Sequence, residues 1–192
     1  KEYKNDKEAM MAVFSEAGYR DAKIVSDSIS YNDEGRIILD ININQGKKYY
    51  FRDITWTGNS VYTADQLNKV LMIGKGDVYD LVTMDKRLQG DPKQQHMDVR
   101  KMYTDNGYLF FQVNPVEMTI EGDSVDVQMR IHEGKPATFN NVIINGNTIT
   151  SERVARRAVY TRPGYLYSQS DFERSIRELG SIGHFDPERF QS

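Results

Sequence analysis

An internal repeat divides this sequence into units. The stretch 51–59, Phe-Arg-Asp-Ile-Thr-Trp-Thr-Gly-Asn, returns 88 positions later at 139–147 as Phe-Asn-Asn-Val-Ile-Ile-Asn-Gly-Asn. Apolar and polar side chains alternate in both copies and both end at Gly-Asn, which is typical of a short strand that leaves through a turn. The same shift continues without a gap as far as the pair Leu88 and Ile176. Self-similarity over this length indicates tandem domains.

The repeat predicts three units. An 88-residue unit is long enough to enclose its own hydrophobic core, unlike the shorter repeats of a solenoid. We expect 1–50 to be the C-terminal part of one domain, 51–137 a complete domain and 138–192 the N-terminal part of a further domain. On this expectation the first domain begins before residue 1, and the last continues beyond residue 192.

The middle unit has the predicted order β-α-α-β-β, which makes the chain α+β. Apolar spacing predicts strands at 51–58, 109–120 and 124–132, and helices at about 64–72 and 84–106. Gly90-Asp91-Pro92 interrupts the second helix, because a proline cannot donate to the preceding turn. The first unit repeats the second half of this order, with a helix at 7–17, a strand at 19–31 and a second strand carrying Ile37, Leu39, Ile41 and Ile43.

The pattern of the first strand of the middle unit predicts which of its side chains face the helices. If the strand is regular, Ile54 and Trp56 share one side and face the helices. Phe51, Asp53 and Thr55 then lie on the other side.

The strand at 109–120 changes the parity of its apolar residues along its length. Phe111 and Val113 share one face, whereas Met118 and Ile120 have the opposite parity. We therefore expect a β-bulge near Asn114-Pro115, where a proline is tolerated. The strand at 19–31 shows the same change between Ile24 and Ile29.

Composition and motifs give no support for an enzyme. The 192 residues are 39% hydrophobic and 28% charged, with a net charge of −3 and no cysteine. These values exclude a basic nucleic-acid footprint, a disulfide scaffold and thiolate chemistry. The three histidines, His96, His132 and His184, lack partners at ligand spacing, and Gly74-Lys75-Gly76 lacks the spacing of a phosphate-binding loop. We expect no catalytic residue, no cofactor and no metal, and no apolar run reaches the length of a membrane span.

The repeated order of motifs resembles tandem polypeptide-transport-associated (POTRA) domains. A Gly-Asn follows the first strand, Gly107-Tyr108 follows the second helix, and a Gly-Lys pair precedes the next unit. The resemblance covers essentially the whole chain. The third unit, with Leu179-Gly180 and 183–185 in place of Gly-Tyr, is similar to the domain that precedes a membrane barrel. The interruption at 90–92 is similar to the Bacteroidetes branch of the family.

The resemblance implies what such domains are and where they act. Each would be a three-stranded mixed sheet covered on one face by two helices, with its last strand in the middle. The chain would be the periplasmic part of an outer-membrane protein that assembles β-barrels. Its partners would be nascent outer-membrane proteins, accessory lipoproteins or periplasmic chaperones, and its own C-terminal barrel, and nucleic acid would not be among them. The alternative is the POTRA region of a secretion or translocation barrel.

The route implied for binding is β-augmentation, in which an extended client pairs with an open sheet edge. The hairpin strands would supply those edges. The expected client-binding residues are Leu109, Phe110, Phe111, Gln112, Val113, Asn114, Tyr19, Arg20 and Lys23. The residues expected to shape the modules are Gly18, Gly58, Asn59, Gly107, Tyr108, Gly134, Gly146 and Asn147.

Overall fold

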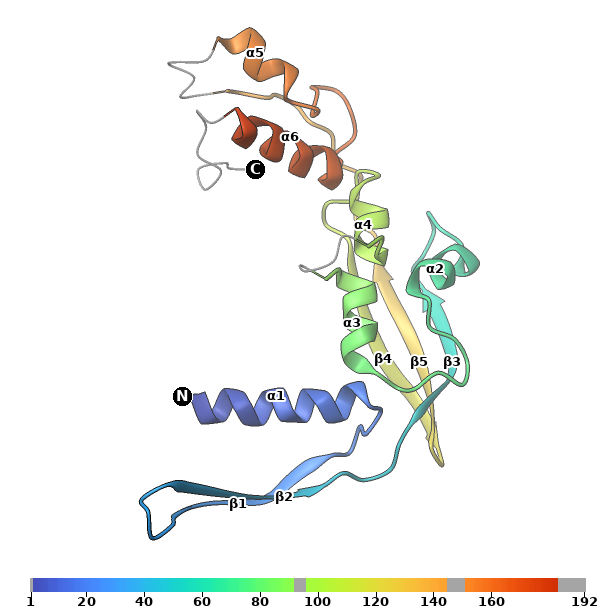
Figure 1. The fold of residues 1–192 in the computed structure, drawn as a ribbon. Coiled ribbons are helices and arrows are strands. Elements are labelled where there is room, and N and C mark those ends of the chain that lie inside the picture. Colours follow the sequence, from blue (N-terminus) through green and yellow to red (C-terminus); the bar gives the residue numbers. More distant parts are fainter. Residues whose placement is uncertain (1, 92–95, 145–150, 183–192) are drawn as a thin grey trace.

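A computed structural model describes residues 2–91, 96–144 and 151–182 of the chain. The three units follow one another along an elongated molecule, with the middle unit between the other two (Figure 1). The first unit contains α1 (Glu2–Glu16), β1 (Lys23–Tyr31) and β2 (Ile37–Asn44). The middle unit contains β3 (Tyr50–Thr57), α2 (Ala64–Leu71), α3 (Leu81–Gln89), α4 (Val99–Thr104), β4 (Gln112–Glu121) and β5 (Ser124–His132). The third unit contributes α5 (Glu152–Arg157) and α6 (Gln169–Ser181).

The middle unit is a mixed sheet covered by helices. Its strand order is β3-β5-β4, with β5 parallel to β3 and antiparallel to β4. The α+β fold with the last strand in the centre is therefore confirmed. Side chains from one sheet face and from α2, α3 and α4 form a single core. Its fully buried members include Phe51, Leu67, Leu71, Tyr79, Leu88, Val99, Tyr103, Val125, Val127 and Met129.

The facing of β3 differs in part from the expectation. Ile54 and Trp56 pack against the core, as expected, and the Trp56 indole donates to Asn68 of α2 at 2.7 Å. The expectation for Phe51 was wrong, because its side chain is only 1% exposed and packs on Tyr79 with ring centroids 4.8 Å apart. The register shifts between Phe51 and Asp53. This bulge changes the parity of the strand, so residues on both sides of it face the core.

The bulge in β4 lies further along the strand than expected. Pro115 pairs regularly with Met129, and the register shifts between Glu117 and Thr119 instead. The expected position at Asn114-Pro115 was therefore wrong. Glu117 lies opposite the inward Val127, so a charged side chain occupies an inward position that an apolar pattern cannot reveal. In β1 the corresponding shift lies between Ile24 and Ser26, inside the predicted interval.

Four helices, α2, α3, α4 and α6, begin at residues whose side chains cap them, and the predicted interruption is confirmed. Thr63 and Gln66 form the capping box of α2, and Ser168 accepts from the Asp171 amide at the start of α6. The predicted helix at 84–106 is two helices, α3 and α4, with Asp80 and Asp98 as N-caps. Each cap satisfies an amide that has no partner within the helix.

Both hairpin strands begin later than predicted, and the cause is the turn that ends each preceding helix. Tyr19 donates its amide to Phe14, and Tyr108 donates to Tyr103, so each chain doubles back before it extends. The strand predicted from residue 19 begins at Lys23, and the one predicted from residue 109 begins at Gln112.

The third unit lacks the strand predicted at its start. Residues 139–144 form no strand, although Thr138 makes an isolated bridge with Leu166. The described part of this unit contains no strand that could pair with them, and a strand needs a neighbour for its backbone hydrogen bonds. Gly146 and Asn147 lie outside the described residues.

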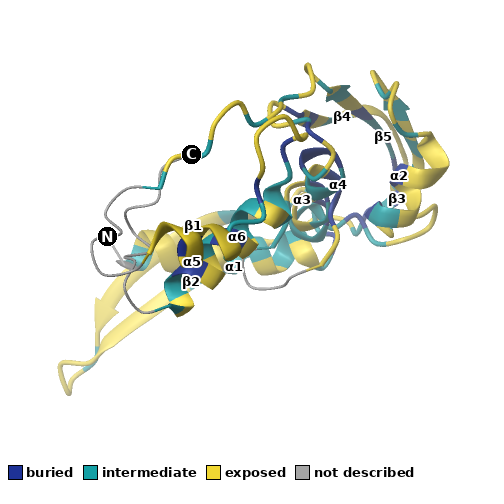
Figure 2. Ribbon diagram, turned by 90° about the horizontal axis from the view of Figure 1, so that it is seen from above, coloured by how far each residue is buried: buried dark blue, intermediate teal, exposed yellow. Residues whose placement is uncertain are grey.

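The first unit exposes the apolar stripe that the middle unit buries. Ile37 and Leu39 of β2 are 63% and 48% exposed, whereas the residues 88 positions later, Val125 and Val127, are at most 1% exposed. In the middle unit, three helices and β3 contribute to the core around this stripe. Among the described elements of the first unit, the hairpin has α1 alone to cover it, and Figure 2 shows the hairpin largely exposed.

Candidate protein-binding edge

The β4 strand is an open sheet edge. It pairs with β5 on one side, and no described strand lies on its other side. In an antiparallel pair, the backbone groups of alternate residues point away from the partner strand. The carbonyl of Val113 accepts from Nε2 of Gln89 at 3.4 Å and therefore points to the open side. By the same alternation, Pro115 and Glu117 also direct their backbone groups outward.

Three features limit how long a strand could pair with this edge. Pro115 has no amide hydrogen, which removes one donor from the open side. The long hydrogen bond from Gln89 partly occupies the Val113 carbonyl. The bulge at Met118 ends the regular ladder. Such features are common protections of exposed edges, and they leave a short regular stretch from Gln112 to Glu117.

A groove of about 630 Å³ opens at the start of β4. Its lining includes all six consecutive residues predicted for client binding in this unit. These residues are Leu109, Phe110, Phe111, Gln112, Val113 and Asn114. The remaining lining residues come from α3, α4 and β5, namely Gln89, Arg100, Arg130, Ile131 and His132. The helical residues Gln89 and Arg100 were missed from the sequence, because nothing in their local pattern indicates that they reach the strand edge.

The predicted residues in the groove differ in exposure. Phe111 is buried and stacks on Tyr103 with centroids 4.1 Å apart, so it belongs to the core. Val113 is also buried, while Phe110 is 66% exposed and Leu109 38% exposed. Only the last two offer apolar surface to a partner.

The predicted residues of the first unit do not form a matching edge site. Tyr19 packs against Phe14 in the turn before β1. Arg20 points into the junction with the middle unit, where Nη2 lies 2.5 Å from Oε2 of Glu117. Lys23 begins β1 opposite Asn44. The structure therefore brings together the six predicted residues before and at the start of β4 and leaves these three outside that groove.

Glu117 joins the two units. Its carboxylate accepts from Arg20 and from the hydroxyl of Tyr79 at 2.6 Å. The hydrogen bond from Arg20 is the largest influence on its pKa, and together with that from Tyr79 it lowers the pKa below the ordinary value despite burial. The turn between α1 and β1 of the first unit thus lies against the far end of the β4 edge.

The predicted structural glycines within the described residues take conformations that explain their identity. Gly58 has φ +84°, and a Cβ there would lie 2.1 Å from the carbonyl oxygen of Ile131. Gly18, Gly107 and Gly134 also have positive φ. Asn59 donates from its side chain to the carbonyl of Tyr62 at 2.9 Å, which closes the turn after β3.

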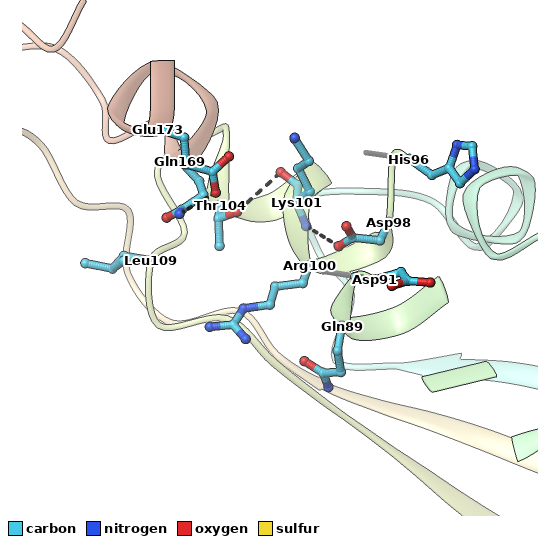
Figure 3. A pocket seen from close by; sticks show the side chains of 11 residues that line it. Gln89, Asp91, His96, Asp98, Arg100, Lys101, Thr104, Leu109, Gln169 and Glu173 are labelled. Carbon is cyan, nitrogen blue, oxygen red and sulfur yellow. Dashed lines mark hydrogen bonds between the residues drawn. The ribbon is translucent and has the colours of Figure 1, made fainter. Parts of the chain in front are cut away.

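A second cavity of about 450 Å³ lies beside α3, α4 and α6, and Figure 3 shows its lining. Asp98 caps α4 through the amide of Lys101, and burial raises the pKa of its carboxyl. Arg100 extends the other way, toward the β4–β5 ribbon (Figure 3). No cluster of three or more His, Asp or Glu residues able to hold a metal occurs among the described residues.

These domains belong to a known class. The family model described as POTRA, surface antigen variable number repeat, matches residues 49–134 and 137–189, together more than half of the chain. The chain is therefore a member of the POTRA family and is the periplasmic part of an outer-membrane protein. The boundaries predicted at 50/51 and 137/138 stay a prediction. In the described part of the chain, no helix is long and apolar enough to span a membrane.

Named relatives point to one kind of protein. The chain is 25% identical to outer membrane protein assembly factor BamA of Nitratidesulfovibrio vulgaris, covering 94% of this chain and 22% of that protein. It is 25% identical to BamA of Neisseria meningitidis, covering 78% of this chain and 20% of that protein. The chain thus spans about a fifth of these relatives. The crystal structure of Haemophilus influenzae BamA POTRA3-5 has the same fold, with a TM-score of 0.71, 19% identity and coverage of 96% of this chain and 70% of that one.

Proposed function

We propose that this chain is a docking module of an outer-membrane protein assembly factor and acts without catalysis. Unfolded outer-membrane proteins would add an extended segment to the open edge of β4, and accessory lipoproteins or chaperones would bind the same arm. The observation that carries the proposal is the groove beside that edge, which is lined by Leu109, Phe110 and the start of β4. The names of the BamA relatives support assembly over secretion.

Backbone pairing suits clients of varied sequence. A docked strand bonds through its main chain, so many sequences fit, and pockets beside the edge select only a few side chains. The edge is short, and each bond has a net value of about 0.5–1.5 kcal/mol, from which the cost of ordering the client must be subtracted. We therefore expect weak, reversible binding.

Nuclear magnetic resonance of the chain 1–192 tests the edge directly. A ten-residue peptide with the alternating pattern of a barrel strand is titrated into the labelled protein. We expect the largest shifts, and new protection from solvent exchange, at the amides of Val113 and Glu117, which point to the open side. The central strand β5 should change less. Shifts confined to α2 and α3 would overturn the proposal.

The variant Gln89→Ala tests whether the Val113 carbonyl takes part. Removing the amide frees this acceptor, so the peptide should bind about two- to fivefold more tightly, within the value of one hydrogen bond. The matched control is Gln45→Ala, an exposed glutamine in the segment before β3, which should leave affinity unchanged. Equal affinities for both variants would show that the client does not use this carbonyl.

A further inference from the structure

We infer that the β4 groove selects extended segments that carry acidic side chains on both faces of the docked strand. This inference rests on the proposed function, since it specifies which client sequences the edge prefers. Its basis is a pair of arginine side chains at the groove that form no ion pair with an acid in the described part of the chain, whose net charge is −3 overall.

Two arginines line the groove without an ion pair. Arg100 of α4 makes no hydrogen bond or ion pair with any described residue. Arg130 of β5 donates to the neutral Gln128 at 2.9 Å and lies 4.0 Å from the sulfur of Met118. His132 follows on the same strand and also lines the groove. Both guanidinium groups therefore keep their charge available to a partner.

The acids Asp98 and Glu173 form no ion pair with Arg100, although the charge of Arg100 acts to lower the pKa of Asp98. Asp98 lies two residues away, but its carboxylate is buried and accepts from the Lys101 amide at 2.7 Å. Glu173 of α6 accepts from Gln169 at 2.8 Å. Figure 3 shows Arg100 turned away from Asp98 and toward the strands. Its direction is that of the β4 edge and not of the second cavity's acids.

The two arginines lie on opposite faces of the sheet. Arg100 approaches from the helical side, where Gln89 reaches the Val113 carbonyl. Arg130 lies opposite Asn114, and His132 opposite Gln112, on the outer face. Side chains of a docked strand alternate between these two faces. Two neighbouring acidic residues in the client would therefore meet one arginine each.

The two ends of the β4 edge differ in chemistry. Leu109 and Phe110 line the groove ahead of β4 and are 38% and 66% exposed. Beyond the groove, Glu117 at the other end of the edge is already paired with Arg20. Arg130 lies opposite Asn114 and its guanidinium reaches toward Met118. The favoured client therefore has its acidic pair along the middle of the β4 edge, between Phe110 and Met118.

Three matched peptides test the inference on the chain 1–192. Each is a ten-residue strand former, and they differ only at two adjacent positions, which carry Glu, Gln or Lys. We expect the Glu peptide to bind roughly three- to tenfold more tightly than the Gln peptide, because two partly exposed pairs each contribute modestly. The Lys peptide should bind most weakly. Raising the salt from 50 to 500 mM should remove most of the difference.

The variants Arg100→Gln and Arg130→Gln assign the preference to the groove. Each should reduce the Glu-over-Gln ratio by about half or more while the Gln peptide binds as before. The control Lys75→Gln removes one exposed charge in the turn between α2 and α3 and should leave the ratio intact.

The outcomes separate the two ideas. Equal binding of all three peptides, with shifts at the β4 amides, would overturn the acidic preference and leave the docking edge in place. Absence of shifts at β4 with every peptide would overturn both. Binding to vesicles of anionic phospholipid is measured for the parent chain and both arginine variants. If the variants weaken vesicle binding while the three peptides bind equally, the arginines serve a membrane surface and the inference is wrong.

Discussion

At the scale of single residues, Glu133 holds the end of β5 to the loop after β3. Its carboxylate accepts from the amides of Ser60 at 2.8 Å and Val61 at 2.9 Å, from the Ser60 hydroxyl, and from the hydroxyl of Tyr103 at 3.0 Å. Burial raises the pKa of Glu133, but these hydrogen bonds outweigh it and hold the pKa below its ordinary value. The charged form is therefore the one that the fold stabilises.

The variant Glu133→Gln should destabilise the middle unit by about 1.5–3 kcal/mol at pH 7, the range for hydrogen bonds to a charged group. Because the folded pKa is depressed, the contribution of Glu133 is complete above the unfolded pKa of about 4.3 and is lost as pH falls through the folded pKa. The stability gap between the two proteins should close below pH 4. Urea unfolding at several pH values measures it.

Asp53→Asn is the control for this measurement. Asp53 lies on the exposed face of β3 in the same unit, and its carboxylate forms no hydrogen bond with a side chain or amide in the described part of the chain. Its removal should cost little. A gap for Glu133→Gln that stays constant from pH 7 to pH 3 would show that the side chain acts through packing and not through charge.

At the scale of elements, the bulge in β4 decides which residues face the core and where the edge ends. Glu117 pairs with Val127 and Thr119 with Asp126, so Met118 is the extra residue. Its side chain is 53% exposed. Deleting it would join two stretches whose register already agrees.

Deletion of Met118 should therefore leave the fold intact and lengthen the regular edge. We expect circular dichroism to show unchanged secondary structure and a melting temperature within a few degrees. Because a longer flat edge pairs more readily, sedimentation velocity should detect more self-association, and strand peptides should bind more tightly. Loss of the folded signal would instead assign the bulge a necessary role in placing Glu117.

The same bulge marks the limit of what the sequence could predict. Periodicity was sufficient for the element order, the helix interruption at 90–92 and the packing of Trp56. Periodicity failed for Phe51, because the bulge in β3 changes the parity of that strand. It failed for the β4 bulge, because an inward Glu117 is acceptable only when Tyr79 and Arg20, distant in sequence, supply donors. Likewise, β4 itself was predicted as an edge, whereas Gln89 reaches it through the tertiary fold alone.

At the scale of the whole molecule, the two junctions share one backbone arrangement. Tyr49 donates its amide to the carbonyl of Gly18 and accepts from the amide of Tyr79, both at 2.9 Å. At the next junction, Ala137 takes the place of Tyr49, and donates to Gly107 at 2.8 Å while accepting from Tyr167 at 2.9 Å. The repeat therefore extends to the way successive units are joined.

Side chains reinforce these junctions differently. The first has Arg20 on Glu117, and a longer contact of 3.9 Å between Lys86 and Glu16. The second has Asp105, which accepts from both the amide and the hydroxyl of Ser170 at 2.7 Å. Loss of one such contact should loosen its own junction and leave the other unaffected.

The variant Arg20→Gln should widen the range of angles between the first and middle units. Spin labels at cysteines introduced at Glu8 and Lys69 would report it, since the natural chain has no cysteine. We expect a broader distance distribution than in the parent chain. The control Arg36→Gln removes an arginine from the exposed hairpin turn, whose ion pair is with Glu34, and should leave the distribution unchanged.

A double-mutant cycle combines Arg20→Gln with Glu117→Gln and compares their free energies of unfolding. The coupling between the two residues should be about 0.5–1 kcal/mol, as in other partly exposed ion pairs. Additive effects would mean that Arg20 does not hold the junction through Glu117.

Pro115 and Gln89, which limit pairing at the β4 edge, also limit how long a docked segment stays bound. Association of a flexible segment with a protein surface commonly proceeds at about 10⁵–10⁷ M⁻¹s⁻¹. With a dissociation constant on the order of 100 μM, the bound lifetime at these rates is about a millisecond to a tenth of a second. If the edge binds clients as we propose, a polypeptide that must move on to become a barrel would be released many times each second. Pro115 and Gln89 would then favour rapid release of clients over storage.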